Sequence, residues 1–197
     1  MQNKINTKKS GYTIIETMIA VSLFVVIITT GVGALLNANL LHQKSRDMRS
    51  IMDNLSFILE DMSRNLRTGW NYECISDEES IPALPPSPTS CPYGIGVYFQ
   101  SSLGRWAYHI DTNPSDINKL SVFKSVDESG AMIQYLLTPE EVDIDPVSGF
   151  SVLGAEPPSG DEQQPFVIIR LVGTLTFKDT VTPFSLQTSV SQRLIDI

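Results

Sequence analysis

YTIIETMIAVSLFVVIITTGVGALL, residues 12–36, decides how this chain is organised. No charged residue lies between Thr17 and Leu41, and Glu16 stands immediately before this apolar run. About 20 apolar residues are enough for an α-helix to cross roughly 30 Å of hydrocarbon. Residues 17–36 therefore predict a membrane-spanning helix. A carboxylate at its entrance costs a few kcal/mol by insertion scales, so Glu16 is expected to have a partner or a task.

The charges around the apolar run predict its orientation. Lys4, Lys8 and Lys9 precede it without any acidic residue, which favours an N-terminus in the cytoplasm and a head on the other side of the membrane. Residues 44–53 carry charges of both signs and weaken this bias. A cleaved secretory signal peptide with its cleavage site at Ala38 is the alternative, although its apolar core would normally be shorter.

The helix is expected to continue beyond the membrane. After Leu41, apolar residues recur in steps of three and four, which is the pattern of an amphipathic helix with one buried face. No proline interrupts residues 12–68, and Gly69 supplies a stop. Within the apolar half, TTGVG at 29–33 allows either close helix packing or local unwinding. The stripe consists of Met48, Ile51, Met52, Leu55, Ile58, Leu59, Met62 and Leu66.

The remainder predicts an antiparallel sheet packed on the amphipathic half-helix, 42–68, which is an α+β fold. Alternating runs separated by turn residues predict strands, with 166–177 and 184–194 forming a hairpin across KDTVTP. The proline-rich segment 81–92 and most of 138–165 are expected to be loops. The expected domains are a leader at 1–11, a membrane helix at 12–41 and a head at 42–197 with its sheet at 95–194. The strands are expected at 96–100, 105–110, 120–124, 132–137, 150–153, 166–177 and 184–194.

Composition excludes some classes of function. The chain has 14 Lys and Arg against 22 Asp and Glu, a net charge of −8. Because nucleic-acid affinity depends largely on clustered basic residues, no nucleic-acid partner is predicted. The only two cysteines, Cys74 and Cys91, are expected to form a disulfide in an exported head, with two reduced thiols as the alternative.

The sequence gives little support to an enzyme. It contains no GxSxG, HExxH, Walker A or Rossmann pattern, and no cofactor or metal is predicted. His109 is expected to be an ordinary strand residue. Acidic loop residues are interpreted as solvated charge, with calcium as the alternative. These clusters lie at 77–79, 140–145 and 161–162.

The motif KKSGYTIIE, residues 8–16, resembles the prepilin signature of type IV pilins and type II secretion pseudopilins. The resemblance implies that a membrane-bound prepilin peptidase cuts after Gly11 and methylates the new amino group of Tyr12, where the family most often has Phe. It also implies a type IV pilin-like fold. Glu16 becomes the fifth residue of the mature chain, where it is expected to pair with the N-terminal amine of a neighbouring subunit and set the register of assembly. The alternative is a Glu at the membrane surface that reaches the headgroups.

A looser resemblance narrows the class of subunit. Residues 52–69 and 150–194 are similar to J-type minor pseudopilins and W-type minor pilins. The expected protein is a minor subunit near the tip of a type IV pilus or a type II secretion pseudopilus, whose partners are other pilins, the assembly platform and the inner membrane. A signal-anchored adhesion or binding protein that does not assemble is the alternative. Its recognition surface would use the aromatic residues Trp70, Tyr72, Tyr93, Tyr98 and Trp106, which in strands are more often core.

Overall fold

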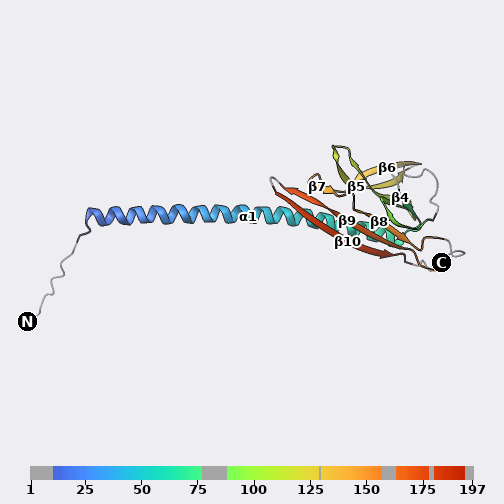
Figure 1. The fold of residues 1–197 in the computed structure, drawn as a ribbon, viewed down its shortest axis with the longest axis horizontal. Coiled ribbons are helices and arrows are strands. Elements are labelled where there is room, and N and C mark those ends of the chain that lie inside the picture. The colour runs from blue at the N-terminus through green and yellow to red at the C-terminus, as the bar shows by residue number, and fades with distance from the viewer. Residues whose placement is uncertain (1–10, 77–87, 129, 157–162, 178–179, 194–197) are drawn as a thin grey trace, which may run out of the picture. The chain divides into compact units, whose positions relative to one another are not determined.

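The computed structural model describes residues 11–76, 88–128, 130–156, 163–177 and 180–193. They form two compact units, Met1–Arg46 and Asp47–Ile197. One helix, α1 (Ile14–Thr68), runs through both, and ten strands belong to the second unit (Figure 1). The fold is therefore a long apolar N-terminal helix followed by an antiparallel sheet, which confirms the predicted α+β class.

The second half of α1 is amphipathic, as its sequence period predicts. Ile51, Leu55, Ile58, Met62 and Leu66 are buried, and the remaining apolar residues of the stripe are partly buried against them. Full burial of one such side chain stabilises a fold by about 1.5–3 kcal/mol. This stripe provides the helical side of the head's core.

α1 ends at Thr68, and Gly69 follows it. A Cβ at Gly69 would overlap the ring of Phe99, so glycine lets β3 (Gly96–Ser101) lie close to the end of the helix. The hydroxyl of Tyr72 lies within hydrogen-bond distance of the carbonyl oxygens of Leu66 and Gly69, and the distance to Gly69 is 2.8 Å. The last helical turn is thus satisfied by a buried side chain from the following strand.

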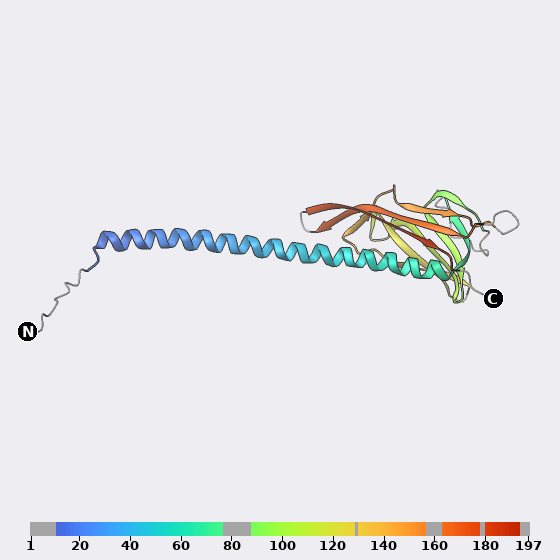
Figure 2. The ribbon, with the colours of Figure 1, turned by 90° about the horizontal axis from the view of Figure 1, so that it is seen from below.

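The sheet is antiparallel and its long path runs β1-β3-β4-β5-β7-β9-β8-β2, with β10 paired to β9 and β6 paired to β5. A parallel bridge between Glu73 of β1 and Thr89 joins one end of this path to the segment just before β2 at the other end. Figures 1 and 2 show β9 and β10 alongside the second half of α1. The strands are β1 (Trp70–Ile75), β2 (Cys91–Gly94), β3 (Gly96–Ser101), β4 (Gly104–Asn113), β5 (Asp116–Glu128), β6 (Ala131–Leu136), β7 (Val142–Ile144), β8 (Gly149–Leu153), β9 (Phe166–Phe177) and β10 (Thr180–Ser191).

Period-2 burial places one face of β9 and of β10 in the core. In β9, Val167, Ile169, Leu171 and Leu175 are buried, whereas Arg170 on the opposite face is exposed. The buried face packs with the α1 stripe in one hydrophobic cluster. A smaller cluster of Ile75, Tyr98 and Ala107 lies apart from it.

The structure corrects several predicted boundaries. The sheet begins at Trp70 rather than at residue 95, because β1 and β2 belong to it. β7 lies within 138–165, where only the strand at 150–153 was expected. β10 begins at Thr180 rather than 184 and ends at Ser191. The leader residues 1–10, the loop residues 77–87 and residue 194 lie outside the described residues.

Candidate functional site

The predicted processing and assembly residues lie together at the start of α1. Gly11 and Tyr12 precede the helix, and both are exposed. Thr13 caps the helix: its side-chain Oγ1 accepts the N–H of Glu16 at 3.4 Å, and its carbonyl oxygen accepts the N–H of Thr17 at 3.2 Å. The helix therefore begins at Ile14, two residues after the expected cleavage point.

Glu16 has a local role that the sequence reasoning missed. Thr13-x-x-Glu16 has the spacing of a capping box, in which Ser or Thr precedes the helix and Glu or Gln follows three residues later. A carboxylate in the first turn also interacts favourably with the helix dipole, by about 0.3–1 kcal/mol at an exposed site. Glu16 is exposed, and its backbone N–H donates to the side chain of Thr13.

Among the described residues, no other part of the chain covers the apolar half of α1, whose most apolar stretch of 18 residues is 0% buried. Side chains such as Phe24 (64% exposed) and Ile27 (68% exposed) project into solvent. By length and composition this helix can cross a membrane, and its exposure distinguishes it from the buried core helix of a globular domain. An apolar surface of this extent needs lipid or other helices around it.

The polar side chains in this half are matched to an apolar environment. Residues 17–36 contain four hydroxyl groups, and each donates a hydrogen bond to a carbonyl of its own helix. The donor–acceptor distances are 2.8 Å for Thr17, 2.9 Å for Ser22, 2.7 Å for Thr29 and 2.6 Å for Thr30. A hydroxyl satisfied within its own helix enters hydrocarbon without the cost of an unmade hydrogen bond.

The TTGVG segment is helical throughout. A Cβ at Gly31 or Gly33 would meet no atom within 4 Å, so neither glycine is required by packing inside the chain. Their small size leaves space for another helix to approach closely.

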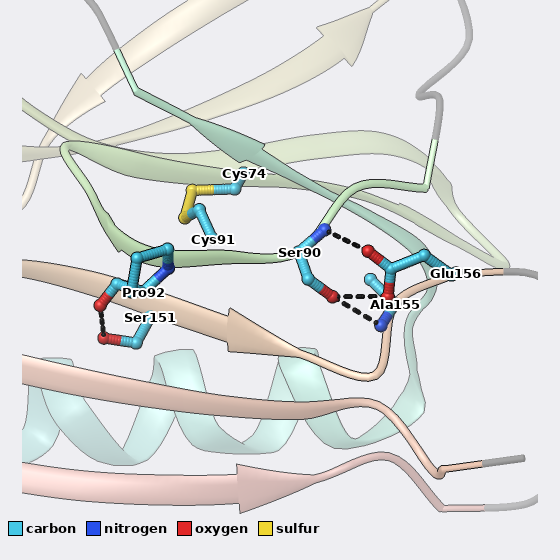
Figure 3. Close-up of a disulfide and its surroundings, with 7 residues drawn as sticks. All are labelled: Cys74, Ser90, Cys91, Pro92, Ser151, Ala155 and Glu156. Atoms are coloured by element: carbon cyan, nitrogen blue, oxygen red, sulfur yellow. Dashed lines mark hydrogen bonds between the residues drawn. A yellow bond between two sulfur atoms is a disulfide. The ribbon is translucent and has the colours of Figure 1, made fainter. Parts of the chain in front are cut away.

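Cys74 and Cys91 form a disulfide between β1 and β2, with their Cα atoms 5.9 Å apart (Figure 3). A Cβ on Gly94 would overlap the Sγ of Cys74, so the glycine lets β2 lie against the bridge. The link closes a loop with a sequence separation of 17 residues. Such a loop stabilises a fold by about 3 kcal/mol in the chain-entropy model.

A carboxylate fixes the segment beside the disulfide. The N–H and hydroxyl of Ser90 donate to the two carboxylate oxygens of Glu156, at 3.1 and 2.6 Å (Figure 3). The hydroxyl oxygen of Ser90 accepts the N–H of Ala155 at 3.0 Å. The pKa of Glu156 lies below its usual value, and the hydrogen bond from the Ser90 hydroxyl makes the largest contribution to this decrease. The entry of β2 and the exit of β8 are thus tied together.

A polar cluster joins α1 to the sheet. The hydroxyl of Tyr108 donates to Asp61 at 2.9 Å and accepts a hydrogen bond from Asn65 at 2.7 Å. Lys124 pairs with the same Asp61 carboxylate at 3.2 Å and lies 4.2 Å from the ring centroid of Trp106. Burial raises the pKa of Tyr108, so its hydroxyl remains a donor across the physiological range. These contacts orient the helix on the sheet and present no reactive group.

The aromatic side chains considered for a recognition surface mostly serve the fold. Tyr72 and Tyr98 are buried, and Trp70 and Trp106 are partly buried. Tyr93 is 50% exposed, but its hydroxyl lies 2.6 Å from the carbonyl oxygen of Pro146 in the neighbouring loop. The five side chains do not form one exposed surface.

The titratable residues of the described chain do not gather into a metal-ligand cluster. No group of three or more His, Cys, Asp or Glu side chains is close enough to hold a metal ion there. His109 lies in β4, 5% exposed, and its ring stacks on Phe123 with centroids 5.5 Å apart. Burial lowers its pKa. The acidic residues at 77–79 and 161–162 lie outside the described residues.

The chain matches no protein-family model, no curated protein and no solved structure.

Proposed function

We propose that the chain is a minor pilin or pseudopilin, processed by a prepilin peptidase and assembled near the tip of a type IV pilus or type II secretion pseudopilus. The observation that carries the proposal is the order of features along α1. An exposed Gly11–Tyr12 pair precedes a capped helix start, and Glu16 lies in the first turn. An uncovered apolar helix follows and continues without interruption into the head's core.

The mechanism is assembly rather than catalysis. The apolar helix stores the subunit in the membrane with its head outside the cytoplasm. Cleavage after Gly11 creates an amine at Tyr12, and Glu16 of one subunit meets the amine of its neighbour in the water-poor centre of the filament. Coulomb attraction is stronger there than in water, while desolvation offsets much of the gain. An unmatched pair would leave two buried charges, so the pair sets the axial register more than it adds stability.

The exposed position of Glu16 supports this role. Its backbone N–H is used by Thr13, whereas its carboxylate is exposed and therefore accessible to a neighbouring subunit. The four backbone-bonded hydroxyls and the open surfaces of Gly31 and Gly33 support a helix that exchanges lipid for other helices.

The first experiment is mass spectrometry of the mature N-terminus. We expect a chain that begins at methylated Tyr12. An intact Met1 would instead identify a signal-anchored protein that does not assemble, and a new terminus near Ala38 would identify a secreted head.

The second experiment tests the charge of Glu16. Glu16→Gln keeps the shape and the hydrogen-bonding capacity but removes the charge, so expression and cleavage should persist while incorporation into filaments is lost. Glu60→Gln is the matched control, because Glu60 lies on the exposed face of the same helix, where it pairs with Arg64 at 3.3 Å. Normal incorporation of the Glu16→Gln subunit would show that the register argument is wrong.

A further inference from the structure

A short basic segment of α1 follows its apolar half. Lys44, Arg46 and Arg49 lie in this segment, and Asp47 is the one acidic residue from position 17 to position 52. Residues 44–49 therefore have a net charge of +2, whereas residues 50–197 hold 8 Lys and Arg against 20 Asp and Glu. This local reversal of charge marks a part of the helix that attracts anions.

Two of these basic side chains are neighbours on one side of the helix. Arg46 and Arg49 are three residues apart, and both are exposed. None of the four positions three or four residues away from Arg46 is acidic, so its own helix offers it no carboxylate partner. Like charges at this spacing repel each other. An anion bound between the two guanidinium groups would remove that repulsion.

The length of the helix places the basic segment at the level of a membrane surface. Arg46 lies 30 residues after Glu16, which is about 45 Å in an α-helix with a rise of 1.5 Å per residue. A bilayer with its headgroup regions is about 40–45 Å thick. With Glu16 at one surface of the membrane, Arg46 therefore lies at the other surface.

Lipid phosphates are the anions that surround a helix at this level. A long basic side chain can lay its apolar stem along the helix and extend its charged end to the headgroups. A guanidinium group binds a phosphate through two parallel hydrogen bonds. Lys44 is about 200° around the helix from Arg46, so the basic residues lie on opposite sides of α1. Lipids surround a single spanning helix on all sides, whereas a protein partner would cover one side.

We propose that Arg46 and Arg49, with Lys44 on the opposite side, bind the phosphate groups of anionic phospholipids at the membrane surface beyond the spanning segment. The proposal rests on the membrane location in the proposed function, but it requires neither cleavage nor assembly. Because both surfaces of a bilayer carry phosphate, it holds for either orientation of the helix.

Lipid titration followed by native mass spectrometry tests this binding. The full chain in neutral detergent is titrated with phosphatidylglycerol or with phosphatidylcholine, which share the phosphate but differ in net charge. The parent chain should bind phosphatidylglycerol about 25-fold more tightly, from about fivefold for each arginine. The double variant Arg46→Gln with Arg49→Gln should bind the two lipids equally. Equal affinity of the parent chain for both lipids would overturn the proposal.

Arg64→Gln with Arg67→Gln is the matched control. These two arginines are also exposed and three residues apart on α1, but they lie 18 residues further along the helix. The control loses the same net charge and should keep the parent's preference for phosphatidylglycerol. Arg46→Lys with Arg49→Lys retains both charges and should keep that preference too. A preference lost in the control pair, or kept in the Arg46→Gln with Arg49→Gln variant, would overturn the proposal.

Two further measurements identify the source of the phosphate and the place of contact. Sodium phosphate in place of sodium chloride, at the same ionic strength, should leave phosphatidylglycerol bound. Displacement would assign the site to free phosphate and overturn the choice of a lipid. A phosphatidylglycerol with a photoreactive headgroup should form adducts within residues 37–50, whereas adducts confined to residues 51–197 would overturn the assignment to the basic segment.

The same material keeps the two proposals distinguishable. In vesicles, resistance to alkaline carbonate extraction reports insertion of the helix, and mass spectrometry reports the N-terminus. An inserted chain that begins at methylated Tyr12 and binds the two lipids equally refutes the lipid site alone. An uncut N-terminus with a clear preference for phosphatidylglycerol refutes the pilin proposal alone.

Discussion

Leu55→Ala compared with Phe57→Ala tests how the amphipathic half of α1 contributes to the head. Leu55 is 0% exposed within the main hydrophobic cluster, whereas Phe57, two residues away on the same helix, is 71% exposed. A buried Leu→Ala change removes apolar contacts and leaves a cavity, which costs about 2–5 kcal/mol. Phe57→Ala truncates a larger side chain, but one that is already exposed to solvent. It should therefore change the free energy of unfolding by about 0.5 kcal/mol or less.

Urea unfolding of the full chain in detergent, followed by tryptophan fluorescence, measures this difference. Trp70 and Trp106 are the only tryptophans and both belong to the unit Asp47–Ile197, so the signal reports the head. With a denaturant slope of about 2 kcal/mol per molar, a loss of about 3 kcal/mol lowers the midpoint by about 1.5 M for Leu55→Ala. Equal shifts for the two variants, or a larger one for Phe57→Ala, would refute the assignment of the buried face.

Three further predictions concern the head. Replacing Cys74 and Cys91 by Ser should lower the free energy of unfolding by about 3 kcal/mol, measured as a shift of the urea midpoint that reductant reproduces in the parent chain; an unchanged midpoint would contradict it. Tyr108→Phe removes the hydroxyl that donates to Asp61 and should cost about 1–2 kcal/mol in the same assay, with no cost if the cluster is dispensable. Burial lowers the pKa of His109 in the folded chain. Below pH about 6.5 the unfolded chain therefore binds more protons than the folded chain. The free energy of unfolding should then decrease as the pH falls, by up to about 1.4 kcal/mol per pH unit. Urea midpoints at pH 7.5 and 5.5 measure this decrease. If the His109→Gln variant lost as much stability between these two pH values as the parent chain, His109 would not be its cause.

The helix and its buried stripe follow from the sequence because their pattern is local and long. Steps of three and four persist from Met48 to Leu66, and all the most buried helix positions belong to that series. The glycine that follows the helix at residue 69 was also predictable, but its contact with Phe99 was not. The ring of Phe99 reaches this position only through the fold of the sheet.

The three missed strands have little pattern of their own. β1 follows the helix directly, and Asn71 within it has a positive φ of 54° where its register with β3 shifts. β2 has four residues, one of them Pro92, and β7 has three. Segments this short become strands because a neighbour supplies hydrogen-bond partners. Their pairing depends on distant residues, which a local pattern does not contain.

Some residues of the candidate site could be predicted from the sequence, and others could not. The Gly11–Tyr12 pair, Glu16 and the two cysteines are visible as a motif or a count in the sequence. The capping role of Thr13 was visible too, from its spacing to Glu16, and was missed. The cluster of Asp61 and Tyr108, which are 47 residues apart, arises only when α1 packs on β4.

The internally bonded hydroxyls of the first half of α1 have a consequence for how that segment orients about its own axis. With Thr17, Ser22, Thr29 and Thr30 each turned back to a carbonyl, all sides of the segment present nearly the same hydrocarbon-like surface. In the proposed membrane location, lipid would impose no preferred rotation of the segment about its axis, and rotation would cost little until the proposed neighbouring subunit binds. The charged side chain of Glu16 then distinguishes one side of this helical segment from the others.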